Sequence, residues 1–89
     1  MDEDVSVFAL IYEGIECKCI PVGRQAYDNC YFEAGLVEGH PYDSLYVKLK
    51  RDNEETVILF RPDEMLALIW VMSGALWSQK IADVSQREE

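Results

Sequence analysis

Hydrophobic positions divide the chain into short strand-like segments and one long apolar segment near the C-terminal end. In the first part, apolar residues fall at every second position or run through both faces of a segment, and turn residues separate the segments. Both patterns are typical of β-strands. We therefore predict four or five strands, at residues 5–12, 15–22, 31–37, 45–51 and 56–61.

The clearest alternation is in "LYVKLKR", residues 45–51. One set of alternate positions is aliphatic, and the other carries an aromatic ring and two lysines. Because successive side chains of a strand point to opposite faces of the sheet, we expect the aliphatic set to face the core and the other set to face solvent. The two sets are Leu45, Val47 and Leu49, and Tyr46, Lys48 and Lys50.

A helix is predicted to begin at Pro62, because proline suits the first helical position, where no N–H is needed. Asp63 and Glu64 follow, and the helix dipole favours negative charge in the first turn. The apolar pattern continues to about Ala82. The predicted fold class is α+β: an antiparallel meander of four to five strands, then one long, largely buried C-terminal helix. We expect a single domain over residues 1–82 and a disordered tail over 83–89.

The central turns of this helix are apolar almost all the way round. One face of a sheet covers an arc of about 100–150°, so a second surface must cover the remainder. Either a curved sheet and its loops wrap the helix, or a second copy of the helix packs against it across a two-fold axis. The small size of the domain favours a homodimer. The predicted contact residues are Leu66, Trp70, Ser73, Gly74, Trp77 and Ile81.

Acidic residues exceed basic ones by 17 to 8, which gives a formal net charge of −9. Such a field repels nucleic acids and anionic membranes and attracts basic partners, although acidity also serves solubility alone. We predict a non-enzymatic interaction protein that binds a partner with a basic surface; a nucleic-acid-mimicking inhibitor is a specific form of this prediction. The candidate contact residues are Glu13, Glu16, Asp28, Glu33 and Glu38.

The N-terminal residues are acidic where a signal peptide would be basic, so a cytoplasmic location is predicted. The apolar stretch Met65–Trp77 is thirteen residues long, whereas a bilayer span needs about 20. We therefore expect no membrane association.

Three cysteines cannot all pair within one chain, and free buried thiols are the expected state. Cys17, Cys19, Cys30 and His40 together would make a Cys₃His zinc set, but Cys17 and Cys19 lack the spacing of a zinc knuckle. His40 would need a partner acid and a nucleophile to act as a general base, and nothing in the sequence fixes such a geometry. We predict no cofactor and no catalytic residues, and a metal-binding or enzymatic domain ranks third among the functional hypotheses.

The alternative function is single-stranded nucleic acid binding, with Lys48 and Lys50 on phosphates and Tyr46 stacked on a base. Strands followed by a long helix that pairs across a dimer resemble the positive-cofactor-four and Whirly single-stranded-DNA-binding domains over residues 45–82. This resemblance implies a dimeric nucleic-acid-binding sheet. The chain departs from those families at the turn "DNEE", 52–55, which is acidic where they carry basic, glycine-containing hairpins.

Overall fold

The structure is a computed structural model that describes residues 6–87, with side chains described as far as residue 80. It contains one sheet and one helix in the order that the sequence predicted. The elements are β1 (Phe8–Tyr12), β2 (Ile15–Ala26), β3 (Cys30–Glu38), β4 (Leu45–Arg51), β5 (Glu54–Phe60) and α1 (Pro62–Arg87).

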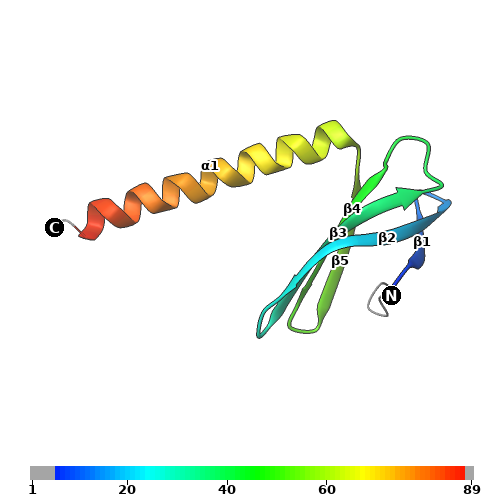
Figure 1. Cartoon of the computed structure of the whole chain (residues 1–89), viewed down its shortest axis with the longest axis horizontal. Helices are drawn as coiled ribbons and strands as arrows, with labels where there is room; N and C mark the ends of the chain where they lie inside the picture. The colour runs from blue at the N-terminus through cyan, green and yellow to red at the C-terminus, as the bar shows by residue number, and fades with distance from the viewer. Residues whose placement is uncertain (1–5, 88–89) are drawn as a thin grey trace.

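The five strands form an antiparallel sheet in the order β1-β2-β3-β4-β5. Each strand pairs with its neighbour in sequence, so the α+β meander followed by a C-terminal helix is confirmed (Figure 1). Strand β2 is longer than predicted and continues to Ala26. Its register against β3 shifts between Pro21 and Gly23, which lets the proline lie in a sheet despite its missing N–H.

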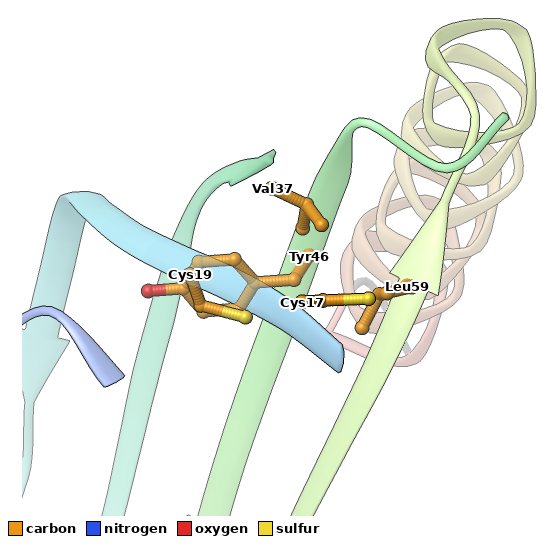
Figure 2. Packing of buried hydrophobic residues seen from close by; sticks show 5 residues of the cluster. All are labelled: Cys17, Cys19, Val37, Tyr46 and Leu59. Atoms are coloured by element: carbon orange, nitrogen blue, oxygen red, sulfur yellow. The ribbon is translucent and has the colours of Figure 1, made fainter. Parts of the chain in front are cut away.

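One face of the sheet, which we call the core face, holds the buried residues of the domain. The Tyr46 side chain lies at its centre and is 0% exposed. An added Cβ at Gly35, its register partner on β3, would lie 2.7 Å from the Tyr46 ring and 2.1 Å from the Ile20 carbonyl oxygen. Glycine at this position therefore gives the tyrosine its space. Figure 2 shows the buried cluster, which consists of Cys17, Cys19, Val37, Tyr46 and Leu59.

The predicted orientation of β4 is wrong. Tyr46 and Lys48 lie on the core face, and Leu45, Val47 and Leu49 lie on the opposite face. The predicted alternation of β4 side chains between the two faces is correct, but alternation alone does not show which set of side chains faces the core. The register places Tyr46 between Gly35 and Leu59, and this arrangement buries the ring rather than the leucines.

The prediction of a largely buried helix is also wrong. Helix α1 projects from the end of the sheet (Figure 1), and it contacts the sheet chiefly at β5. Its large apolar side chains are mostly exposed. The helix continues to Arg87, beyond the predicted end near Ala82. The expected disorder of residues 83–89 stays a prediction, and residues 88–89 lie outside the described part of the chain.

A single residue, Arg61, connects β5 to α1. Its backbone N–H donates to Glu64 Oε1 at 3.0 Å, and its carbonyl accepts the first helical bond from Met65 N–H at 3.0 Å. Its guanidinium pairs with Asp63, at 3.3 Å between Nε and Oδ1. Glu64 thus supplies one half of a capping box, while its own N–H donates to Asp63 Oδ1 because arginine has no side-chain acceptor. The start of the helix is therefore well capped.

Candidate functional site

Helix α1 carries a long exposed apolar surface. Trp70 is 79% exposed and Trp77 is 64% exposed, whereas large aromatic residues in a monomer usually bury most of their area. Soluble monomers rarely leave such a surface uncovered unless it is an interaction site. The exposed large hydrophobic residues of α1 are Leu66, Ile69, Trp70, Val71, Met72, Leu76 and Trp77.

The predicted self-association residues are all on this helix. Leu66, Trp70, Ser73 and Trp77 are exposed, and an added Cβ at Gly74 would meet nothing within 4 Å. The side chain of Ile81 lies outside the part of the chain whose side chains are described. Within the single chain, the described part of this set is therefore uncovered, as a surface for a partner must be.

A second apolar surface lies on the sheet, on the face opposite the core face. We call it the open face. The register aligns Phe32 with Leu49, Leu36 with Leu45, and Val47 with Ile58. None of its residues is buried, and four are exposed: Phe32, Leu36, Leu49 and Ile58. Its apolar residues are Ile20, Phe32, Ala34, Leu36, Leu45, Val47, Leu49, Ile58 and Phe60.

The overall dimensions reflect these two uncovered surfaces. The chain has a radius of gyration of 16.3 Å, against about 12 Å for a compact domain of this length. Its accessible surface is 6904 Å², against about 5,400 Å² for a compact monomer of this mass. The single chain therefore exposes more surface than its size requires.

The acidic candidates separate into one internal residue and several exposed ones. Glu33 is 6% exposed and lies on the core face. It accepts hydrogen bonds from the hydroxyls of Tyr31 and Tyr46, and Lys48 Nζ lies 4.0 Å from its Oε2. Burial alone would raise the pKa of this carboxyl. The two tyrosine hydrogen bonds and the charges of Lys48 and Arg24 outweigh burial and lower it.

The same contacts act on the two tyrosines. Burial, together with the hydrogen bond to the Glu33 carboxylate, raises the pKa of Tyr46 far above its ordinary value and raises that of Tyr31 as well. Both hydroxyls therefore stay protonated donors at neutral pH. Glu33 accordingly stabilises the fold from inside and does not offer its charge to a partner.

Glu13, Glu16, Asp28 and Glu38 are exposed. Glu13 lies in the β1–β2 turn, whereas Asp28 lies in the β2–β3 turn at the opposite end of the sheet. These carboxylates do not form one patch, and sequence reasoning could not have distinguished Glu33 from them.

The residues predicted to bind single-stranded nucleic acid do not form an exposed face. Tyr46 is fully buried, so its ring is not available to stack on a base. Lys48 lies 4.1 Å from the centroid of the Phe8 ring and pairs with Glu33 and Glu55. Lys50 is exposed and lies 5.8 Å from the Tyr31 ring centroid. The structure therefore leaves one exposed lysine of the three expected contact residues.

The structure does not bring the four candidate zinc ligands together. Cys17 and Cys19 are buried on the core face, and burial, with the nearby Cys17 thiol, raises the pKa of Cys19. Cys30 begins β3, and His40 follows the end of that nine-residue strand. At about 3.3 Å per residue, the two ends of the strand, Cys30 and Glu38, lie about 26 Å apart. His40 follows two residues after Glu38, at the end of the strand far from Cys30. All three cysteines are free thiols, but only Cys17 and Cys19 are buried as expected, and Cys30 is half-buried.

His40 is instead part of a cluster that the sequence did not predict. Its side chain is 3% exposed, and Nε2 lies 3.2 Å from Glu13 Oε1. Nδ1 accepts the backbone N–H groups of Tyr42 at 3.2 Å and Asp43 at 3.0 Å. These bonds fit the tautomer that carries hydrogen on Nε2 and donates it to Glu13. A meander places the β1–β2 turn, with Glu13, and the β3–β4 loop, with His40, at the same end of the sheet. This topology is the one feature from which the contact between Glu13 and His40 could have been predicted.

This cluster adjoins a cavity of about 530 Å³ beside the start of α1. Glu13, His40 and Asp43 have ligand atoms within 4.8 Å of one another, so they could in principle surround a metal ion. However, Nδ1 already accepts two N–H groups, and Glu13 lies on the other nitrogen. The arrangement is that of a histidine that fixes the conformation of the β3–β4 loop.

The comparisons with known proteins give no match: no family model, no curated protein and no solved structure is similar to this chain. The resemblance to single-stranded-DNA-binding domains therefore gains no support from them. Within the described residues, no helix has an apolar stretch of the length that a membrane span requires.

Proposed function

We propose that this chain is a non-enzymatic interaction protein that self-associates through α1. The observation that supports the proposal is the exposure of seven large hydrophobic side chains, two of them tryptophans, on one helix of a single chain. Tryptophan is the residue type most enriched among those that dominate binding energy at interfaces. An isolated helix with this surface would be poorly solvated, so a partner surface stabilises it.

The test is the solution mass by light scattering across a range of protein concentrations. We expect the wild-type chain to have a mass of two or more 10.3 kDa chains. The double variant Trp70→Ala/Trp77→Ala should dissociate to single chains, because it removes the two largest exposed rings. Tyr42→Ala, which removes an exposed ring from the β3–β4 loop, is the matched control and should retain the wild-type mass. A wild-type chain that stays monomeric at high concentration would refute the proposal.

A basic protein partner is a further part of this proposal, and it rests on the net charge of −9 and on the exposed carboxylates of Glu13, Glu16, Asp28 and Glu38. Because exposed charges are screened by salt, such binding should weaken as ionic strength rises. The acidic residues lie at both ends of the sheet, so a partner would contact one end rather than a continuous patch. Binding that is insensitive to salt would contradict this part.

A further inference from the structure

Each chain carries two uncovered apolar surfaces of different shape. One is the convex surface of α1, and the other is the open face of the sheet. Each chain has one surface of each kind. In a two-fold dimer, if surface A of the first chain contacts surface B of the second, then surface A of the second chain contacts surface B of the first. A helix that packs on the partner's sheet would therefore cover both surfaces of both chains at once.

The surface that the chain leaves uncovered is large enough for such a contact. The accessible surface of 6904 Å² exceeds that of a compact monomer of this mass by roughly 1,500 Å². A stable interface of standard size removes about 800 Å² from each partner. This excess, summed over the whole chain, is about twice the area that each partner of a standard interface loses.

The two surfaces also match in length and in charge. The apolar segment Met65–Trp77 is about 18 Å long at 1.5 Å per residue. The open face extends across four strands, β2 to β5, whose outer axes are about 15 Å apart. No charged residue lies between Met65 and Gln79. On the open face, charged residues lie at the two ends of the strands, Lys18 with Glu38 at one end and Arg51 with Glu54 at the other. The negative charge of the chain would then stay at the rim of the contact.

The helix of a single chain does not cover its own sheet but points away from it (Figure 1). One residue separates β5 from α1, and the capping hydrogen bonds from and to Arg61 hold the first turn in place. A second copy can present its open face to this helix without any change at the junction.

We infer that α1 of one chain packs across the open face of a second copy, whose own α1 packs reciprocally on the first. The inference rests on the self-association proposed above and specifies the surface that receives the helix. Trp70 and Trp77 contact the aliphatic positions of the partner sheet. Phe32, Leu36, Leu49 and Ile58 form the receiving surface on that sheet. In this arrangement Ser73 and Gly74 do not pack against the helix of the partner, as they would in a helix-to-helix dimer.

The experiment is a complementation test with two variants of the full chain. The helix variant is Trp70→Lys/Trp77→Lys, and the sheet variant is Phe32→Lys/Ile58→Lys. All four positions are exposed in the single chain. Every substitution introduces the same charge, so no ion pair can form between the introduced side chains of the two variants. The affinity and mass of each variant, and of an equal mixture of differently tagged variants, are measured by light scattering and analytical ultracentrifugation.

We expect each variant alone to lose self-association by about tenfold or more, which corresponds to about 1.4 kcal/mol. The mixture should form a heterodimer, because the intact helix of the sheet variant can pack on the intact sheet of the helix variant. One of the two contacts is then restored. Tyr42→Lys, in the β3–β4 loop, is the control and should associate like the wild-type chain. Circular dichroism should show that each variant retains the sheet.

Other outcomes separate the two proposals. If the sheet variant associates like the wild-type chain while the helix variant does not, helices pack on helices, and this inference fails although the proposed function stands. If neither variant associates and their mixture does not either, the inference also fails. A wild-type chain that is monomeric throughout overturns both. Should the sheet variant not fold, the single substitution Leu36→Lys tests the same surface at a more exposed position.

Discussion

Tyr46 and Trp70 illustrate the difference between the two halves of the molecule. Tyr46 is fully buried on the core face, and its hydroxyl donates to Glu33. Trp70 is 79% exposed on α1. Both are large aromatic residues in regular secondary structure, but only the tyrosine has its partners within the chain. The sheet therefore has its stabilising contacts within the chain, whereas the apolar surface of the helix is mostly exposed there.

This difference has an energetic consequence. A helix in water gains most of its stability from tertiary packing of its apolar face. In the single chain, α1 has that packing only near β5. Substitutions on the core face should therefore destabilise the protein at any concentration, and substitutions on α1 should act mainly on association. The following predictions test this distinction, from the largest expected effect to the smallest.

Gly35→Ala should give the largest loss of stability. Its new Cβ would lie 2.1 Å from the Ile20 carbonyl oxygen and 2.7 Å from the Tyr46 ring, so the backbone of β2 must move. We expect a loss of about 3 kcal/mol in the free energy of unfolding, at the upper end of the usual cost of overpacking. Urea unfolding followed by circular dichroism measures it.

Gly23→Ala is the matched control, because an added Cβ there meets nothing within 4 Å. It should leave the unfolding free energy nearly unchanged. Equal effects at the two glycines would show that the close packing of the core face around Tyr46 is not what stabilises the sheet.

Glu33→Gln should lower the unfolding free energy at pH 7 by about 1–3 kcal/mol, since it removes a buried, hydrogen-bonded charge. The folded-state pKa of Glu33 is lowered from its ordinary value of 4.5. Its contribution is therefore complete above that ordinary value and is lost as the pH falls through the folded pKa. The difference in unfolding free energy between wild type and variant should shrink as the pH is lowered from 5. Urea unfolding at a series of pH values from 5 downward measures it.

Glu55→Gln is the control for this titration. Glu55 is exposed and pairs with the same Lys48, at 3.8 Å, and exposed pairs contribute about 0–1 kcal/mol. A difference between wild type and Glu33→Gln that is constant over the whole pH range would contradict the role of the Glu33 carboxylate.

Gly74→Ala should produce the smallest effect and the opposite sign. An alanine in the interior of a helix is more favourable than a glycine by about 0.8–1 kcal/mol, and the added Cβ meets nothing within 4 Å. We expect a higher thermal midpoint by circular dichroism and an unchanged dimer affinity. Ala75→Gly, the reverse change at the next residue, should lower the midpoint. A dimer weakened by Gly74→Ala would indicate that two helices approach closely at this position.

The elements of the fold were largely predictable from the sequence, because they depend on local patterns. The alternation in residues 45–51 located β4, and Pro62 with Asp63 and Glu64 located the start of α1. The orientation of β4 was not predictable, since either set of alternate side chains could face the core. Tyr46 is buried because Gly35 and Leu59 lie beside it in the sheet, and that information is in the pairing of three strands.

The apolar surface of α1 was recognised from the sequence, but its environment was not. A run without polar side chains shows that a helix needs cover, and it does not show where the cover comes from. The direction in which the helix leaves the sheet was not in the sequence pattern. His40 and Glu13 are 27 residues apart and belong to no motif. Only the meander, which places their two turns at the same end of the sheet, could have brought them together.

The placement of the aromatic residues has a consequence for spectroscopy. Both tryptophans of the chain lie on α1, and all five tyrosines lie in the sheet and its turns. Fluorescence excited where only tryptophan absorbs therefore reports on the helix alone. Tryptophan also absorbs wherever tyrosine does, so absorbance does not isolate the sheet. The wild-type protein thus carries one optical signal that is specific to the helix, and dilution or denaturant can be followed in it without introducing a label.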